Sequence, residues 1–153
     1  MDKKLHRIAV TVIIHRDDGK YLITRRSLDE KAFPGMWTVP GGNLETDDYI
    51  NTPPTTSAGQ WYNVLENGIR REIKEEVGLE IGKTTYLLDL TFIRPDNIPV
   101  LVLSYYAPYI GGNVVHDEDT IDSAWVTPEE AKAYDLIDGI AEEIEMVDKI
   151  LQA

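Results

Sequence analysis

Three carboxylate side chains crowd one short stretch in the middle of the chain. Glu72, Glu75 and Glu76 follow directly after Arg71. On a helix that advances about 100° per residue, they fall on one arc beside an apolar stripe. That stripe consists of Leu65, Ile69, Ile73 and Val77. Because like charges at such separations raise one another's pKa, the pattern predicts a bound divalent cation that prefers oxygen ligands.

A glycine pair upstream adds a second chemical signal. The sequence Pro40-Gly41-Gly42 follows a short strand expected at residues 37–39. Proline removes a backbone donor, and glycines allow positive φ and close approach of a ligand to the main chain. We therefore expect a loop that exposes its backbone. The acidic helix alone is also typical of a salt-bridged surface helix, but the stripe and the glycine pair together favour a functional site.

The remaining pattern predicts the elements that must position these groups. Apolar and β-branched runs predict strands at residues 7–14, 21–26, 85–92, 100–106 and 121–126, the first two joined as a hairpin by a turn at 17–20. Residues 47–60 have the composition of an irregular loop. Because strands and helices do not alternate strictly, we expect an α/β fold with a mixed β-sheet sandwiched between α-helices.

Specific residues mark the helix ends. Gly78 is expected to end the acidic helix. A second helix is expected to start with Thr127 as N-cap, Pro128 in the first position and Glu130 closing a capping box. The last segment is expected to be an amphipathic helix packed on the sheet. Its apolar face consists of Ile137, Ile140, Ile144, Val147 and Leu151.

Composition limits the classes of function. The 153 residues are 42% hydrophobic, enough for a single domain over residues 1–153. A formal net charge of −12 opposes bulk binding to nucleic acid or anionic membranes. The chain has no cysteine, which removes disulfides, thiolate nucleophiles and sulfur-ligated zinc. Without a signal peptide or membrane-spanning run, the expected location is cytoplasmic.

Two stretches of the chain resemble the signature of the Nudix hydrolase family, including its MutT-like members. Residues 33–45 read FPGMWTVPGGNLE, and residues 71–79 read REIKEEVGL. The second stretch matches the family pattern R-E-U-x-E-E-x-G-U, with U an aliphatic residue, at every fixed position. The resemblance implies the Nudix fold and a pyrophosphohydrolase that uses Mg2+ or Mn2+ to cleave a nucleoside diphosphate linked to another group.

The resemblance also implies roles for individual residues. Glu72, Glu75 and Glu76 would be metal ligands, with the carbonyl of Gly41 as a further oxygen ligand. Arg71 would pair with a neighbouring carboxylate and hold the helix in register. The metal would neutralise phosphate charge and make the attacking water more acidic. Either a helix glutamate such as Glu72 or Glu75, or a downstream acid, would be the general base, and that choice stays open.

A run of acids before the last strand supplies the downstream candidates. Many family members place a catalytic or metal-binding Glu about six residues before a tryptophan equivalent to Trp125, and that position is Asp119. Asp119 is the catalytic candidate and its neighbour Glu118 the metal-ligand candidate, and the assignment between them stays open. Without the signature, such a run is more typical of a solvated turn.

The chain departs from the family pattern between the two stretches. The signature expects Gly, five residues, Glu, seven residues and then Arg-Glu. Counting forward from Gly42 reaches Asp48, whereas counting back from Arg71 reaches Asn63, so roughly fifteen extra residues split the signature. Asp48 is an acidic substitute for the missing Glu. An insertion beside a site costs little entropy and can change specificity.

Four side chains are candidates for substrate binding. Arg25 and Arg26 alternate across a strand, so one of them is expected to face the cleft and contact phosphate. Phe33 could stack on a base or belong to the core. Trp61, at the end of the insertion, could stack on the substrate or pin the loop to the core. Trp37 is expected to be a core residue.

The predicted function is hydrolysis of a phosphoanhydride bond in a nucleoside diphosphate linked to another moiety, with a nucleoside triphosphate favoured. A non-catalytic nucleotide-binding module is an alternative, because the signature is interrupted. A diphosphate isomerase of the same fold is a weaker alternative, because it typically needs a cysteine. The expected partner is a small-molecule nucleotide, and whether the chain forms a homodimer stays open.

Overall fold

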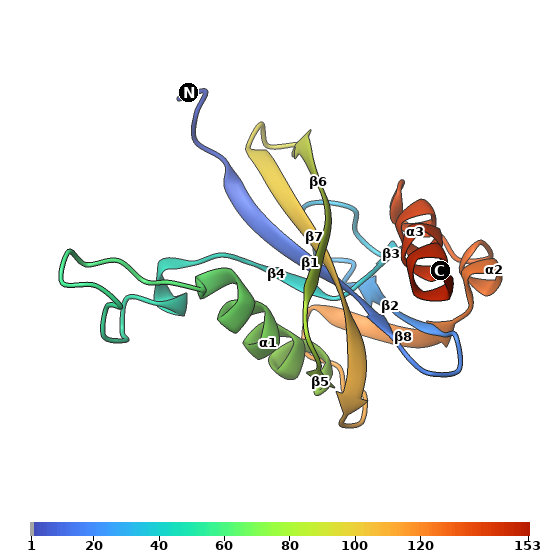
Figure 1. The fold of residues 1–153 in the computed structure, drawn as a ribbon. Coiled ribbons are helices and arrows are strands. Elements are labelled where there is room, and N and C mark those ends of the chain that lie inside the picture. The colour runs from blue at the N-terminus through green and yellow to red at the C-terminus, as the bar shows by residue number, and fades with distance from the viewer. Residues whose placement is uncertain (1) are drawn as a thin grey trace.

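One mixed sheet runs through the molecule, with helices on two sides of it (Figure 1). The computed structural model describes residues 2–153. In this range the strands are β1 (Arg7–His15), β2 (Tyr21–Arg26), β3 (Trp37–Thr38), β4 (Gly41–Asn43), β5 (Glu80–Ile81), β6 (Thr85–Ile93), β7 (Pro99–Gly111) and β8 (Thr120–Val126). The helices are the short 3-10 helix η1 (Thr46–Asp48), α1 (Val64–Val77), α2 (Pro128–Ala131) and α3 (Ile140–Gln152). The predicted fold class is confirmed.

β1 is a central strand of the sheet. It runs parallel to β7 from the pair Arg7 and Val100 to the pair His15 and Pro108. It pairs with β2 only at the closed end of the predicted hairpin, where His15 lies opposite Tyr21. The turn and the ranges of both strands are therefore as predicted. The expected pairing along the hairpin is wrong, because β2 diverges from β1 to pair with β8.

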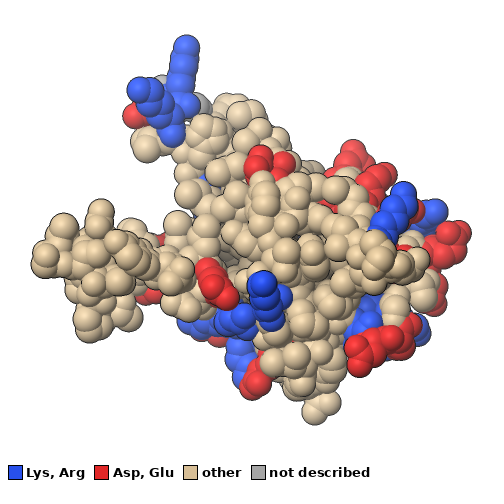
Figure 2. All heavy atoms as spheres, viewed as in Figure 1, with Lys and Arg blue, Asp and Glu red and all other residues tan. Residues whose placement is uncertain are grey.

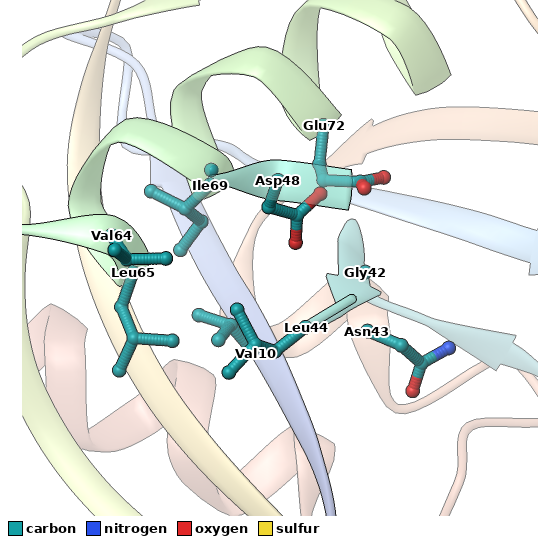
Figure 3. A pocket seen from close by; sticks show the side chains of 10 residues that line it. Val10, Gly42, Asn43, Leu44, Asp48, Val64, Leu65, Ile69 and Glu72 are labelled. Atoms are coloured by element: carbon teal, nitrogen blue, oxygen red, sulfur yellow. The ribbon is translucent and has the colours of Figure 1, made fainter. Parts of the chain in front are cut away.

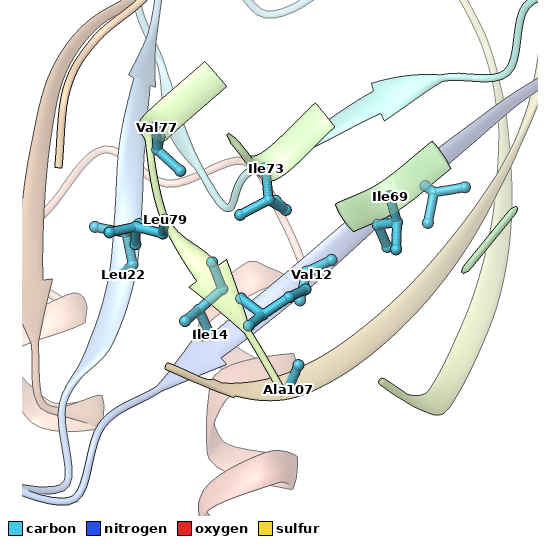
Figure 4. Packing of buried hydrophobic residues seen from close by; sticks show 10 residues of the cluster. Val12, Ile14, Leu22, Ile69, Ile73, Val77, Leu79 and Ala107 are labelled. Carbon is cyan, nitrogen blue, oxygen red and sulfur yellow. The ribbon is translucent and has the colours of Figure 1, made fainter. Parts of the chain in front are cut away.

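Apolar side chains form one cluster on each face of the sheet. The cluster under α1 contains Val10, Val12, Ile14, Leu22, Ile69, Ile73, Val77, Leu79, Ile81 and Ala107 (Figure 4). The cluster under α3 contains Ile13, Tyr21, Ile23, Val39, Val126, Ala131, Ile140, Ile144 and Val147. The predicted stripe of the acidic helix is confirmed, with Leu65 half-buried at its start. Trp37 packs against the second cluster, as expected.

The glycine pair lies in a strand. Gly41 and Gly42 belong to β4, which pairs antiparallel with β1. The prediction of an exposed loop with positive φ is therefore wrong at these residues. Close approach is what requires glycine, since a Cβ on Gly41 would lie 2.2 Å from the carbonyl oxygen of Val10. The pair lets a short strand dock tightly beside β1.

Two predicted helix boundaries are confirmed: the C-terminus of α1 and the N-terminus of α2. α1 ends at Gly78, whose φ of 73° favours glycine, and the Gly78 N–H donates to the carbonyl of Lys74. α2 begins with a capping box, in which the side chains of Thr127 and Glu130 each accept from the other's backbone N–H.

The last helix is shorter than its apolar pattern predicts. α3 starts at Ile140, so Ile137 lies before the helix, although it still packs against the cluster under α3. Leu151 is 44% exposed and does not belong to the buried face.

Of the described helices, none is long and apolar enough to cross a membrane.

An uncharged segment, residues 49–62, projects from the body between η1 and α1, and we call it the arm (Figures 1 and 2). It is irregular, as predicted, but its contacts are specific. The Thr55 N–H donates to the carbonyl of Gln60 over 2.7 Å. The indole N–H of Trp61 donates to the carbonyl of Thr52 over 2.9 Å. The arm is therefore held by its own hydrogen bonds.

Candidate active site

Glu72 and Glu76 extend from α1 to the glycines of β4. Because the apolar stripe of α1 faces the sheet, these two carboxylates lie on the helix flank beside β4. The Gly41 N–H donates to Glu76 Oε2 over 3.1 Å. A Cβ on Gly42 would lie 2.6 Å from the carboxyl carbon of Glu72, so glycine makes room for this carboxylate. Burial raises the pKa of Glu72, and Arg71 offsets part of that effect.

A second strand holds the Glu76 carboxyl group from another side. The hydroxyl of Thr120, a buried residue at the start of β8, donates to Glu76 Oε1 over 3.2 Å. Burial raises the pKa of Glu76 to about 7, against the lowering effect of its two hydrogen bonds. The charges of Asp117 and Glu72 also raise this pKa. A cation beside the carboxylate would therefore relieve an unfavourable buried charge.

Arg71 lies among three carboxylates. Its guanidinium group pairs with Asp48 of η1, and its Nη2 lies 3.4 Å from Glu72 Oε1. Its Nε lies 3.8 Å from Glu75 Oε1. The hydrogen bond to Asp48, helped by the neighbouring carboxylate charges, raises the pKa of Arg71. Asp48 also accepts the Glu45 N–H over 2.9 Å, so Arg71 connects α1 to the segment that follows β4.

Glu75 lies apart from the other two helix glutamates. Its side chain is 62% exposed, with Arg71 beside it. Among residues 2–153, no three Asp, Glu or His side chains converge closely enough to hold a metal ion. In this structure Glu75 therefore does not join Glu72 and Glu76 against β4, because its position on the helix turns it toward solvent. Its charge still raises the pKa of Glu72, as expected for neighbouring acids.

The downstream acid that acts on Glu76 is Asp117, which sequence reasoning missed. Glu118 and Asp119 are exposed in the turn before β8. The Asp117 side chain caps this turn by accepting the Asp119 N–H over 3.0 Å, and its charge raises the pKa of Glu76. The Asp-x-Asp spacing is a signal that could have found it, because the first Asp of such a turn bonds to the backbone two residues on.

Arg25 and Arg26 both hold the loop of residues 27–36. Arg25 Nε donates to the carbonyl of Gly35 over 2.9 Å, and Arg26 Nε donates to the carbonyl of Ala32 over 3.0 Å. The pairing of β2 with β8 shifts register between these two arginines. The extra residue of this irregularity, Ile121, lies on β8. Both guanidinium groups of β2 reach the same loop.

The two aromatic candidates lie in different segments. Phe33, in the loop 27–36, is 37% exposed, and its ring centroid lies 5.6 Å from that of Phe92 on β6. Trp61 lies in the arm, where its ring centroid is 5.2 Å from that of Tyr49. The structure thus brings Phe33 together with the two arginines. The contacts of Trp61 are with Tyr49 and Thr52 of the arm, so it stabilises the arm and does not attach it to the core.

A narrow hollow between α1, β1 and β4 leads to the acids (Figure 3). It is lined by Val10, Gly42, Asn43, Leu44, Asp48, Val64, Leu65, Gly68, Ile69 and Glu72. A wider pocket of about 390 Å³ opens beside it and is lined by Asn63, Val64, Leu65, Glu66, Ile69, Thr84 and Tyr105. The carboxylates of Asp48 and Glu72 therefore line the narrow hollow, and the wider pocket has a mixed lining of polar and apolar side chains.

The NUDIX domain family matches residues 5–147 of the chain. The chain belongs to this family. The matched range includes both signature-like stretches, with β4, α1 and the hollow between them. The expected enzyme class, a Nudix-type pyrophosphohydrolase, is confirmed at the level of the family.

Similar proteins support the NUDIX membership. The nucleoside triphosphatase NudI of Escherichia coli (strain K12 / DH10B) is 30% identical over 131 residues, 79% of this chain and 82% of NudI. The MutT protein from Methanosarcina mazei Go1 shares the fold with a TM-score of 0.72 at 22% identity, over 100% of both chains. The NUDIX domain of Shewanella oneidensis NrtR, solved with ADP ribose, has a TM-score of 0.73 at 18% identity, over 97% of this chain and 90% of that chain.

Proposed function

We propose that this NUDIX protein hydrolyses a phosphoanhydride bond of a nucleoside triphosphate, or of another nucleoside diphosphate derivative, with Mg2+ or Mn2+. The observation that carries the proposal is the pair of carboxylates, Glu72 and Glu76, held against the glycine strand beside Arg71. Family membership supports hydrolysis. The relative named a nucleoside triphosphatase makes triphosphates the first substrates to test.

The donor set of the site fits a hard divalent cation. Glu72 and Glu76 offer carboxylate oxygens beside the backbone of Gly41, and burial of Glu76 favours neutralisation by a cation. Mg2+ is usually bound through one or two carboxylates, with waters and substrate phosphates as further ligands, so a cage of three acids is not needed. We propose Gly41, Glu72 and Glu76 as ligands, with Glu118 as a further one. Such a cation would neutralise phosphate charge and make the attacking water more acidic.

Arg71 is a positioning residue in this proposal. It pairs with both Asp48 and Glu72, and thereby fixes the direction of the Glu72 carboxylate. Asp48 takes the place of the glutamate that the family signature expects. The arm between Asp48 and Asn63 is then the insertion that splits the signature, and pairing of Asp48 with Arg71 keeps the two halves of the signature together.

Two exposed acids are candidates for the general base. Glu75 is the exposed carboxylate beside Arg71, and Asp119 lies in the turn before β8. An exposed carboxylate can take a proton from the attacking water and return it to solvent. Glu75→Gln and Asp119→Asn separate them, since loss of the base should lower turnover far more than loss of the other acid.

The four candidate substrate contacts form two groups. The first group lies at the loop 27–36, which contains Phe33 and is held by Arg25 and Arg26. In this proposal Phe33 stacks on the base, and one of the two arginines contacts phosphate. Trp61 lies in the arm, and Asn63, which follows the arm, lines the wider pocket. Trp61 therefore contacts a different part of the substrate.

The test is release of phosphate and pyrophosphate from a substrate panel with Mg2+, Mn2+ or a chelator. The panel contains ribo- and deoxyribonucleoside triphosphates, nucleotide sugars, ADP-ribose and dinucleoside polyphosphates. We expect cation-dependent release from triphosphates, and a loss of more than about 100-fold for Glu72→Gln at unchanged thermal stability. Tight binding without release from every substrate would instead identify a non-catalytic nucleotide-binding module.

A further inference from the structure

β6 is an edge strand with an unusually apolar composition. Within residues 2–153 it pairs with β7 alone. The backbone N–H and C=O groups on its outer edge therefore pair with no other described strand. Residues 85–93 read TYLLDLTFI, with Asp89 as the one charged side chain. Proteins usually protect such edges with lysines, prolines or very short strands, because an open edge pairs with other chains.

Three of the exposed side chains of β6 are aromatic or aliphatic. Tyr86 is 51% exposed, Leu90 is 37% exposed and Ile93 is 65% exposed. The charge of Asp89 gives this edge limited protection, because its carboxylate accepts a hydrogen bond from the Tyr86 hydroxyl along the same strand. The edge therefore offers both free backbone groups and apolar side chains to a partner.

We propose that β6 pairs antiparallel with β6 of a second copy and joins two chains into a homodimer. A two-fold axis brings the same surface of each copy together, and an antiparallel pair of identical strands has this symmetry. The two sheets then form one continuous sheet, and the open edges of both copies are paired. This inference is independent of the catalytic proposal.

Charge favours a second copy at this strand over other surfaces. Each chain carries a formal net charge of −12, which opposes self-association. Residues 83–96 contain two cations, Lys83 and Arg94, and two acids, Asp89 and Asp96, with Arg94 paired to Asp96, so this stretch carries no net charge. Repulsion between two copies is therefore weaker along β6 than over the acidic remainder of the chain.

The side chains favour a two-fold axis at Leu90. In that register Leu90 lies opposite its own equivalent, and Leu88 lies opposite Phe92 of the second copy. Asp89 lies opposite Thr91 of the second copy, so no two acids face each other. Because Phe92 contacts Phe33, the interface also borders the loop that Arg25 and Arg26 hold.

Sedimentation velocity over a range of concentrations tests the assembly. We expect the wild type to sediment with twice the chain mass of 17.3 kDa. Leu90→Lys places two cations at the axis and should give a monomer with native circular dichroism. The matched control is Ile150→Lys, at a residue of α3 that is 46% exposed, and it should remain a dimer. A monomeric wild type, or a folded Leu90→Lys dimer, overturns the proposal.

A cysteine pair tests the register without weakening the apolar edge. The chain has no cysteine, so a single introduced thiol can form a disulfide only between copies. Directly opposed residues of antiparallel strands have Cα atoms about 4.5–5.5 Å apart, which a disulfide can span. Under mild oxidation Leu90→Cys should give a covalent dimer, and Ile150→Cys should not. Equal cross-linking of both variants, or none in Leu90→Cys, contradicts the pairing.

Discussion

Two glutamates, a half-buried Glu76 and a buried Glu143, extend from helices on opposite faces of the same sheet. Glu76 extends from α1 and accepts hydrogen bonds from Gly41 N–H and the Thr120 hydroxyl. Glu143 extends from α3 and accepts one from the hydroxyl of Ser104 on β7, over 2.9 Å. Burial raises the pKa of both carboxyl groups, to about 7 for Glu76. Burial and a raised pKa alone therefore do not distinguish a functional acid from a structural one.

The surroundings of the two glutamates make the difference. Glu76 lies beside a second half-buried acid, Glu72, and a third acid, Asp117, also raises its pKa. Glycine at residue 42 leaves room for the Glu72 carboxylate on this side. Glu143 lies beside the apolar cluster under α3. The charge that raises its pKa is that of Glu142, its neighbour in sequence. Two neighbouring carboxylates held against a glycine strand favour cation chemistry.

The largest expected effect comes from removing the Glu76 charge. Glu76→Gln keeps the shape and one acceptor but removes the charge that a cation needs. We expect hydrolysis of the best triphosphate substrate to fall more than about 100-fold, because mutating even the outer partners of metal ligands costs about 10–100-fold. Thermal stability should stay equal or rise, since a buried charge is removed. Initial rates and thermal melts measure both effects.

Glu143→Gln is the matched control on the other face. It removes a buried glutamate of the same kind and leaves Ser104 with an acceptor. Its turnover should equal that of the wild type at neutral pH. A comparable loss of turnover in both variants would erase the contrast between the two faces and point to a general effect of buried charge on the fold.

The next largest effect tests how Glu76 is held. Thr120→Val removes the hydroxyl that donates to Glu76 Oε1 and keeps the shape of the side chain. We expect about a 10-fold loss of Mn2+ affinity, the lower end of the range for outer partners of a metal ligand. Thr120→Ser keeps the hydroxyl and should bind Mn2+ nearly as the wild type does. Titration calorimetry measures the affinity directly, and equal affinities in both variants would contradict the positioning role.

Local signals in the sequence predict much of the frame. Gly78 ends α1, and the capping box starts α2, because each depends on residues within one helical turn. The apolar stripe fixes which face of α1 is buried, and therefore which flank carries Glu72 and Glu76. These predictions need no knowledge of distant strands.

Features that depend on distant partners were not predictable in this way. β1 pairs along its whole length with β7. Gly41 and Gly42 form a strand, β4, because they also pair with β1. The direction of Asp117 depends on the turn that its own side chain caps. The register shift at Arg25 and Arg26 depends on the pairing of β2 with β8. Such non-local pairings are set by packing of the whole sheet.

The smallest expected effect is a pH dependence of stability at Glu143. Burial, and to a lesser degree the charge of Glu142, raises its pKa, and the hydrogen bond from Ser104 lowers it only in part. The folded state therefore holds the Glu143 proton more tightly than the unfolded state, where the pKa is about 4.3. This tighter proton binding stabilises the folded state fully at a pH below the pKa of Glu143 in the unfolded chain. The stabilisation is lost as the pH rises through the pKa of Glu143 in the folded protein. Glu143→Gln lacks this loss, so the difference in melting temperature between variant and wild type should grow in favour of the variant as pH rises from 4 upward, and then level off. A difference that stays constant across that range would show that Glu143 binds its proton equally in both states.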